Sequence, residues 1–481
     1  MKCRPDVVKS TVKSLDETPQ SKERTREVGF DQIAGNYFEV DGKKGSLSSV
    51  LIVDSLASAN RTQKGNDLKH YVAGRPVLMN NDKLKHVGHP LLLVVTALSL
   101  FLLTSCQRGN ATNSQPQQSL FTTAPGSPIS IPDGPSNVLI GDVNNDKKLD
   151  LVVALGKTKS VTVLLGKGDG QFAAPNSTMK VPDSPGEMAL GDVNGDGKLD
   201  LANVTHDSYG ALLLLGDGNG GFAIAPNSPI VMKVGQHPHT HGLALADMNS
   251  DNKLDLVTVN NADNDVSIAF GDGRGAFTIA PGSPFPVGPS PYPLAVGDVN
   301  GDGQLDIVAT ATATGPLRAQ QLPLSRALTL LLSDGRGGFR SSQLPLRTGE
   351  PWFAVISDLN GDRKPDIVAT HHELNQLTVM LGDGSGGFVE AGGSPFDLGH
   401  QGFHAVVGDV NRDGKMDVIA AGGDSLLVML GDGRGRFAPG PKIPTGRGAW
   451  RLDEGDLNGD GKMDFVTSNS ESGTVSVLLG R

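Results

Sequence analysis

The sequence predicts an all-β fold, a seven-bladed β-propeller made of four-stranded antiparallel blades. Three observations lead to this prediction. A short acidic motif recurs seven times along the 481 residues. Each copy is flanked by strand-like apolar runs and glycine-rich turns, and helical periodicity is absent throughout. Self-similarity at a period of about fifty residues is typical of propellers and other repeat architectures.

The acidic motif has the form of a cation-binding loop. In "GDVNGDGKLD", residues 191–200, the oxygen-bearing side chains of Asp192, Asn194, Asp196 and Asp200 occupy positions 1, 3, 5 and 9, and Gly197 occupies position 6. An EF-hand loop opens in the same way, but it ends with a glutamate at position 12 and lies between two helices. A strand-like run follows here, so the motif is not an EF-hand.

The repeat unit contains four strand-like segments. An apolar run precedes each acidic loop and a β-branched run follows it. A second apolar run then leads into a glycine turn ending in phenylalanine, such as "GDGNGGF" at 216–222, and a proline-punctuated extended segment completes the unit. Four short strands joined by tight turns form one antiparallel blade. The first motif aspartates, 47 to 60 residues apart, are Asp142, Asp192, Asp247, Asp298, Asp358, Asp409 and Asp456.

The two ends of the repeat region complement each other. The seventh unit stops at "VSVLLGR", residues 475–481, without a fourth strand. The segment "LFTTAPGSPISI", residues 120–131, matches the fourth-strand segment "GFAIAPNSPIVM" at 221–232. We therefore expect residues 120–131 to complete the last blade and close the ring, which removes the exposed edges of an open array.

These repeats resemble the FG-GAP/VCBS type, which forms β-propellers in the heads of integrin α-subunits and in many bacterial surface proteins. The resemblance covers residues 119–481 and all seven units. It implies that each acidic loop lies between the first and second strands of its blade and binds a structural calcium ion, in up to seven sites. The ligands carried over are Asp142, Asn144, Asp146, Asp150, Asp192, Asn194, Asp196, Asp200, Asp247, Asn249, Asp251, Asp255, Asp298, Asn300, Asp302, Asp306, Asp358, Asn360, Asp362, Asp366, Asp409, Asn411, Asp413, Asp417, Asp456, Asn458, Asp460 and Asp464.

The seven loops are not equivalent at position 6. Four have glycine there, whereas the first, third and fifth have Lys147, Asn252 and Arg363. If the loop needs a positive φ at this position, lysine and arginine are strained and also bring positive charge near the ion. We expect the weakest calcium sites in blades 1 and 5, with affinities of about 10⁻⁴ to 10⁻³ M. The alternative is a solvated turn without metal, because Asp, Asn and Gly are also common turn residues.

The N-terminal quarter differs from the repeats. Residues 1–78 lack the repeat pattern and are interpreted as unstructured or a start-site artefact. Residues 79–105 have a positive start and a 14-residue apolar run, and residues 103–106 read "LTSC", so the segment resembles a lipoprotein signal peptide with lipidation at Cys106. The alternative is a plain signal peptide that ends near a cysteine. Residues 106–118 would form a polar tether. These features predict export and membrane anchoring as a cell-envelope or outer-membrane lipoprotein.

Composition limits the partners. The net charge of −10, without a compensating basic stripe, argues against nucleic acid. Two cysteines provide no disulfide framework, so the glycine-rich turns need another source of rigidity, which calcium would supply. We expect a monomer.

The end of the propeller opposite the acidic loops is the candidate ligand face. It carries the second-to-third strand turns, the interblade connections and an eleven-residue insertion around "GPLRAQQLPLSR" in the fourth unit. The motif "HPHTH" at 237–241 leaves transition-metal binding open. An aromatic and basic set maps to the same end: Tyr209, Tyr292, Trp352, Phe403, Arg447, Trp450 and Arg451. The predicted ligand-binding residues are His206, His237, His239, His241, His371, His372 and His404.

Two functions fit this face. The favoured hypothesis is a non-enzymatic binding or scaffold module for a protein or glycan. The alternative is a polysaccharide lyase or hydrolase, with His206, Tyr209 and His241 as nominal members of its site. The sequence has no Gly-x-Ser-x-Gly, His-Glu-x-x-His or phosphate-loop motif, so it assigns no catalytic residue. For each single aromatic or histidine, the alternative is a structural role in the central channel or a loop.

Overall fold

The computed structural model describes residues 119–481 except 132, 176, 205–207, 236–237, 312–325 and 372–373, together with the backbone of 37–40 and 43–46. The chain divides into two compact units, Met1–Asn110 and Ala111–Arg481. In the first unit the structure describes one antiparallel hairpin, β1 (Tyr37–Val40) and β2 (Lys43–Ser46). Cys106, the expected signal peptide and tether, His206, His237, His372 and the insertion in the fourth unit lie outside the described residues. Within the described part, no helix is long and apolar enough to cross a membrane.

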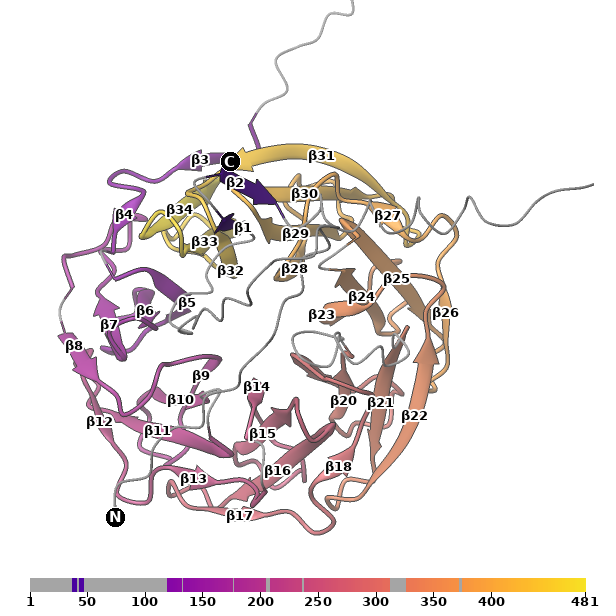
Figure 1. Cartoon of the computed structure of the whole chain (residues 1–481), viewed down its shortest axis with the longest axis horizontal. Helices are drawn as coiled ribbons and strands as arrows, with labels where there is room; N and C mark the ends of the chain where they lie inside the picture. The colour runs from indigo at the N-terminus through magenta and orange to yellow at the C-terminus, as the bar shows by residue number, and fades with distance from the viewer. Residues whose placement is uncertain are drawn as a thin grey trace, which may run out of the picture. The chain divides into compact units, whose positions relative to one another are not determined.

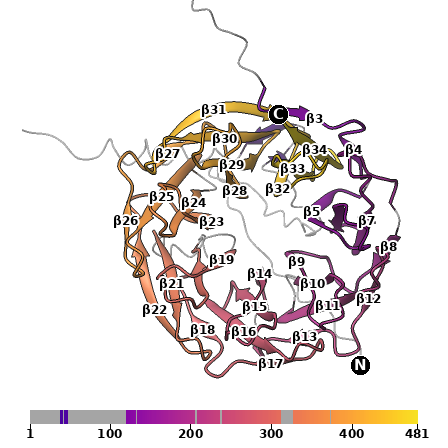
Figure 2. The ribbon, with the colours of Figure 1, turned by 180° about the vertical axis from the view of Figure 1, so that it is seen from behind.

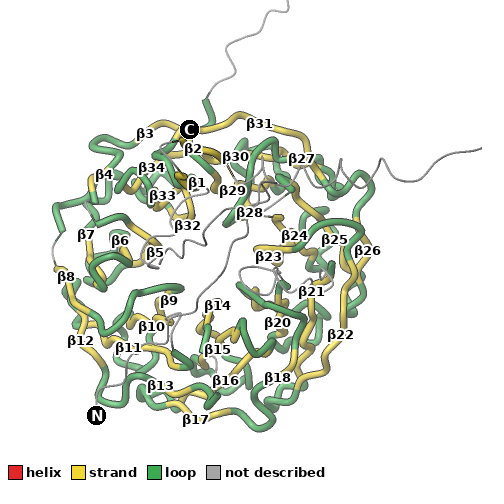
Figure 3. The backbone as a smooth tube through the Cα atoms, viewed as in Figure 1, coloured by secondary structure: helices red, strands yellow, loops and turns green. Residues whose placement is uncertain are grey.

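The second unit is a ring of seven antiparallel sheets, and the described part of it contains only strands, turns and bends (Figures 1 and 3). The first strand of each sheet lies nearest the axis of the ring and the fourth lies at the rim, as both views show (Figures 1 and 2). The predicted all-β, seven-bladed propeller is therefore confirmed.

The first three blades follow the chain in order. Blade 1 contains β5 (Pro135–Gly141), β6 (Asp150–Leu155), β7 (Ser160–Leu164) and β8 (Ser177–Lys180). Blade 2 contains β9 (Met188–Gly191), β10 (Asp200–Val204), β11 (Gly210–Gly216), β12 (Phe222–Ile224) and β13 (Ile230–Val231). Blade 3 contains β14 (Thr240–Ala246), β15 (Asp255–Asn260), β16 (Asp265–Gly271), β17 (Phe277–Ile279) and β18 (Phe285–Pro286).

The remaining blades repeat this plan. Blade 4 contains β19 (Leu294–Gly297), β20 (Asp306–Ala309), β21 (Ala327–Ser333) and β22 (Phe339–Pro345). Blade 5 contains β23 (Pro351–Ser357), β24 (Asp366–His371), β25 (Gln376–Gly382), β26 (Phe388–Glu390) and β27 (Phe396–Asp397). Blade 6 contains β28 (Ala405–Gly408), β29 (Asp417–Gly422), β30 (Ser425–Gly431) and β31 (Phe437–Pro444). Blade 7 contains β32 (Ala449–Gly455), β33 (Asp464–Asn469), β34 (Thr474–Gly480), β3 (Phe121–Thr123) and β4 (Ile129–Ser130).

The N-terminal segment closes the ring as predicted. β3 pairs antiparallel with β34, with Phe121 opposite Gly480, and β4 pairs with the other end of the same strand. The split into two short pieces also occurs in blades 2, 3 and 5, where the outer segment pairs twice with the third strand. The last blade is thus built from both ends of the repeat region.

The hydrophobic core lies between neighbouring blades. The second strands, such as β6 and β33, are buried along their whole length because a sheet packs against each of their faces. Each of seven buried clusters combines residues from two adjacent blades, and the cluster containing Leu151 and Val475 joins blade 7 to blade 1. Closure of the ring therefore buries the last interface in the same way as the others.

Hydrogen bonds identify the two ends of the ring. At one end, glycine turns donate to the acidic loops of the preceding blade: Gly220 N to Val143 O, Gly275 N to Val193 O, and Gly170 N to Leu457 O. At the other end, interblade connections bond to the second-to-third strand turns, as in Gly448 N to Gly423 O. The acidic loops lie between first and second strands, so the predicted division of the two ends is confirmed.

Candidate functional site

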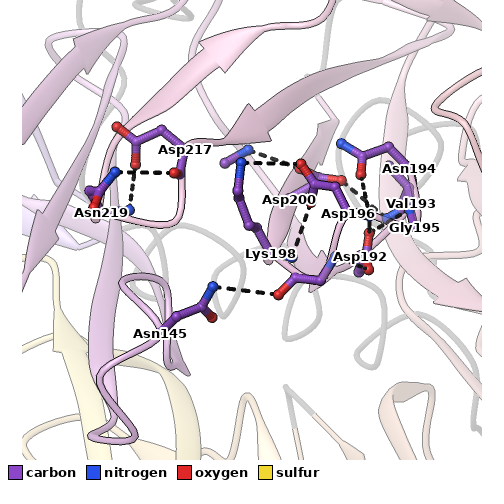
Figure 4. Close-up of polar contacts among 12 residues, drawn as sticks. Asn145, Asp192, Val193, Asn194, Gly195, Asp196, Lys198, Asp200, Asp217 and Asn219 are labelled. Atoms are coloured by element: carbon purple, nitrogen blue, oxygen red, sulfur yellow. Dashed lines mark hydrogen bonds and ion pairs between the residues drawn. The ribbon is translucent and has the colours of Figure 1, made fainter.

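The acidic loops are compact turns held by their own side chains (Figure 4). In the second loop, the Asp192 carboxylate accepts hydrogen bonds from the N–H groups of Gly195, Asp196 and Gly197, at 2.7, 3.2 and 2.8 Å. Asn194 Oδ1 accepts from Asp196 N at 2.9 Å, and Asp196 Oδ1 accepts from Lys198 N at 3.0 Å. Asp196 is exposed, and Asp192 and Asn194 are partly exposed, so all three side chains reach the surface of the loop.

The aspartate at position 9 has a different environment. Asp200 begins β10 and has no exposed surface. Its two carboxylate oxygens accept from Val193 N at 3.1 Å and from Gly216 N at 2.9 Å, which ties the acidic loop to the end of the third strand. Burial raises the pKa of Asp200, the two backbone hydrogen bonds lower it, and the nearby charges of Asp196 and Asp192 raise it.

The same pattern recurs around the ring. Burial raises the pKa of each position-9 aspartate, and it raises that of Asp255 to about 6. The other carboxylates of the same loop add to the rise. Each loop therefore concentrates negative charge that a cation would relieve.

Backbone conformation sets the sequence requirements of the loops. Position 6 has a positive φ in all seven, including Lys147 (66°), Asn252 (61°) and Arg363 (65°). The expectation of a left-handed residue there is confirmed. Position 4 is also left-handed, which the sequence did not lead us to expect; Arg412 (60°) is an example without glycine. The first and fifth loops thus hold a basic residue in a strained conformation.

Lysines at position 7 act as counter-ions to the exposed carboxylates. Five loops pair this lysine with the aspartate at position 5, and the Nζ–Oδ2 distance ranges from 3.6 Å for Lys148–Asp146 to 2.7 Å for Lys462–Asp460. Exposed pairs of this kind contribute little to stability. Among the described residues, no group of three or more His, Cys, Asp or Glu side chains converges in a metal-holding arrangement.

The predicted histidines occupy different environments. His239 and His241 come together, with their Nε2 atoms 2.9 Å apart. His371 has no exposed surface, and its Nε2 lies 2.7 Å from Thr378 Oγ1. His404 packs against Phe353, with ring centroids 4.0 Å apart. Burial lowers the pKa of His371, and it lowers that of His404 to about 3, so both rings are neutral at pH 7.

An aromatic row crosses the interblade end of the ring. The His241 ring lies 3.9 Å from that of Tyr292, and Tyr292 lies 4.2 Å from Trp352. Trp352 meets Trp450 edge-on at 6.0 Å, and Trp450 lies 4.5 Å from Phe403. These residues come from blades 3 to 7 and their preceding connections. They form one continuous row of rings near the axis, which fits the structural role considered from the sequence.

A pocket of about 320 Å³ opens beside this row, and we call it the axial pocket. Its walls are the starts of β5, β14 and β32 and the connections before β9 and β19. Pockets that bind small molecules typically combine an apolar wall with a few polar groups. The lining residues are Ser136, Asn137, Asp183, Ser184, Pro185, Gly186, Glu187, Thr240, His241, Tyr292, Trp450 and Arg451.

An ion pair between Arg451 and Glu187 lies in the pocket wall. Arg451 is 7% exposed. Burial lowers the pKa of Arg451 to about 9, which still leaves the guanidinium protonated at neutral pH. The pair joins the last blade to the connection before the second.

Sequence reasoning reached this face but missed part of its chemistry. His241, Tyr292, Trp450 and Arg451 were expected there, whereas Asn137 was not. Its position at the start of an innermost strand, equivalent to that of Arg451 in the pairing with the second strand, could have indicated it. Tyr209, a nominal catalytic residue, does not line the axial pocket; its hydroxyl donates to Asp263 Oδ2 at 2.5 Å.

The ring and its loops define a class of protein, the β-propellers built from acidic-loop repeats. The family model described as FG-GAP-like repeat matches residues 142–203, 192–258, 247–309, 358–420 and 409–467, which together cover more than half of the chain. The chain belongs to the FG-GAP-like repeat family. A search of curated proteins gives no match.

Solved structures share the fold at low sequence identity. BBS1N in complex with ARL6DN, soaked with lead, is 12% identical, with a TM-score of 0.51 over 76% of this chain and 98% of that one. An Agrocybe aegerita lectin, described as recognising non-reducing terminal N-acetylglucosamine, is 22% identical, with a TM-score of 0.46 over 65% and 81%. The periplasmic gluconolactonase PpgL of Pseudomonas aeruginosa is 16% identical, with a TM-score of 0.47 over 65% and 86%. At such identities the likeness concerns the fold alone.

Proposed function

We propose that this protein is a non-enzymatic binding module that captures a glycan or protein ligand in the axial pocket. The observation that carries the proposal is the pocket itself, where aromatic and polar side chains from several blades meet near the axis. Ligand sites favour such concave junctions of structural elements. The interblade connections that form its walls can vary without disturbing the blades.

The test measures capture by the full chain with an altered pocket. Immobilised protein is exposed to a glycan array and to envelope proteins, and wild type is compared with Trp450→Ala. The matched control is Val389→Ala, on the rim strand β26, where Val389 is 68% exposed. We expect Trp450→Ala to reduce capture and the control to leave it unchanged. Equal capture by all three proteins, at equal melting temperature (Tm), would place binding elsewhere and overturn the proposal.

We propose also that calcium stabilises the propeller through the acidic loops. The donors at positions 1, 3, 5 and 9 are carboxylate and amide oxygens, which suit a hard cation. The residues that would hold the ion in the second loop are Asp192, Asn194 and Asp196, with Asp200 contributing through lone pairs not used by backbone amides. The bound ion would supply positive charge beside the carboxylates of the loop. Its role is structural.

Thermal unfolding tests the calcium proposal. We expect Tm to rise when millimolar CaCl₂ replaces a chelator, and to rise less with the same concentration of MgCl₂, because Mg²⁺ demands a stricter octahedral shell. An identical Tm in calcium and chelator would contradict a stabilising role.

The lipid anchor and export are proposed from the sequence. A lipid-modified Cys106 would tether the propeller to the envelope as a monomer, through the polar segment 106–118. Mass spectrometry of the protein from membranes would show a lipidated N-terminal cysteine, and Cys106→Ser would release the protein from the membrane fraction. An unmodified Cys106 in the mature chain would rule the anchor out.

A further inference from the structure

We infer that the axial pocket binds the ring of an uncharged pyranose at the end of a glycan. This inference rests on the proposed function and specifies its ligand. Three features of the pocket lead to it: an aromatic wall, a set of polar groups without protein partners, and the absence of an unpaired lysine or arginine among its described lining residues.

The aromatic wall suits a sugar ring. Tyr292 and Trp450 both line the axial pocket, and both keep part of their surface exposed. A pyranose presents a face of C–H groups, which packs on an aromatic face while its hydroxyls point outward. Tyr292 lies between the rings of His241 and Trp352, so it offers its edge and hydroxyl to the pocket. Phe403 packs against Trp450, which leaves Trp450 to supply the stacking face, and these contacts preorganise the wall.

Polar groups with unused hydrogen-bonding capacity lie around the same wall. Within the described part of the chain, the Tyr292 hydroxyl, the Trp450 indole N–H and Asn137 Oδ1 form no hydrogen bond. The Asn137 amide is oriented by its Nδ2, which donates to Gly186 O at 3.3 Å. The wall thus offers both donors and acceptors, and sugar hydroxyls both donate and accept.

Charge in the pocket favours an uncharged ligand. Among the described lining residues, Arg451 is the only lysine or arginine, and it is paired with Glu187. Asp183 lies 3.5 Å from Lys159, which is outside the lining. In the part of the wall that the structure describes, a uronate, sulfate or phosphate would meet two carboxylates and no unpaired lysine or arginine, so its charge would lose hydration without compensation.

Size limits the ligand to a small unit. The volume of about 320 Å³ is at the low end of the ~300–1,000 Å³ typical of small-molecule sites. The pocket therefore accommodates a terminal sugar, with the rest of the glycan outside.

The decisive test compares two ligands that differ by one carboxylate. Binding of methyl glycosides of glucose, galactose, mannose and N-acetylglucosamine to the full chain is measured by calorimetry, alongside methyl glucuronide. We expect at least one neutral glycoside to bind. If glucose is the sugar recognised, methyl glucuronide should bind at least about 10-fold more weakly than methyl glucoside, or not at all. For another sugar, the matching uronide is used.

Variants assign the binding to the aromatic wall. Tyr292→Phe removes only a hydroxyl and is expected to weaken binding about 3- to 10-fold. Trp450→Ala is expected to weaken it at least ~10-fold, and Trp450→Phe, which keeps an aromatic face, to restore part of the loss. Val389→Ala is the control, and unchanged Tm shows that each variant is folded.

The outcomes separate the inference from the proposed function. The chain could instead prefer the uronide or capture only a protein, and lose this binding in Trp450→Ala. That result would overturn the sugar assignment, but the axial pocket would still be the binding site. Neutral-sugar binding that survives both Trp450→Ala and Tyr292→Phe would overturn the assignment to this pocket. Absence of binding across glycosides, glycans and envelope proteins would overturn both.

Discussion

Arg451, on the innermost strand of the last blade, forms an ion pair with Glu187, in the connection that leads into the second blade. Glu187→Gln leaves a buried guanidinium without a counter-ion, so we expect it to destabilise the protein by about 3 kcal/mol. This value is the lower end of the range for breaking a buried pair, because the Glu187 side chain keeps some exposed surface. Urea unfolding measures the change. The double variant Glu187→Gln/Arg451→Met should recover most of the loss. Additive losses in the double variant would show that the pair itself contributes nothing.

Ring closure depends on a contact between the N-terminal segment and the last blade. Phe121 is 3% exposed and lies edge-on to Phe465, with centroids 5.1 Å apart. Phe121→Ala should cost about 3–5 kcal/mol and make the N-terminal segment more susceptible to proteolysis. Thr123→Ala, on an exposed position of the same strand, is the control. A loss no larger than that of the control would mean that β3 does not secure the ring.

The buried and the exposed aspartates of an acidic loop should differ in how much their substitution destabilises the metal-free protein. In chelator, Asp200→Asn should cost about 1–3 kcal/mol, because an amide has one acceptor oxygen and two buried backbone N–H groups need one each. Asp196→Asn, at an exposed position, should cost far less. Denaturant unfolding in chelator compares them, and equal effects would contradict the structural role of Asp200.

Strain at position 6 predicts weak calcium binding in the first loop. Lys147 has φ 66°, a conformation that costs a non-glycine residue about 1–2 kcal/mol. Lys147→Gly removes both strain and charge, whereas Lys147→Gln removes the charge alone. We expect both to raise the calcium affinity of this loop in calorimetric titration, and glycine to raise it more. Unchanged affinity in both variants would remove the reason for ranking this site among the weakest.

The pH dependence of stability should contain a contribution from Asp453. Burial raises the pKa of Asp453 to about 6, although hydrogen bonds from the N–H groups of Ile140 and Glu454 lower it. The folded state therefore binds the proton of Asp453 more tightly than the unfolded state does. Protonated Asp453 contributes fully to the free energy of unfolding below about pH 4, and this contribution is lost as pH rises through 6.

Asp453→Asn abolishes this titration and keeps an acceptor for Ile140 N. Its Tm should match that of wild type at pH 4 and exceed it by a few degrees at pH 8. Asp424→Asn, at an exposed position, is the comparison. A variant that is less stable than wild type at pH 8 would show that the charged form of Asp453 is favoured in the fold.

Repetition made the architecture predictable. The acidic loops, strand order and closure by residues 120–131 each recur as local patterns, and the structure confirms all three. The axial pocket was predicted only as a face, because its residues come from three strand starts and two interblade connections in five different blades, and no local pattern shows which of them converge. The burial of His371 could not be predicted either. The sequence places it in a turn after a strand, whereas it is the last residue of β24, where it contacts Thr378 and has no exposed surface.

The pairing of β3 with β34 places the first and last strands of the ring side by side. A peptide linker could therefore join them, and new termini could be opened in another fourth-strand connection without breaking a blade. Such circular permutants are tolerated where the joined ends are close and the cut falls in an exposed loop. The propeller has no intrinsic beginning, and its first described strand, β3, lies at the rim of blade 7 beside the last strand of the chain.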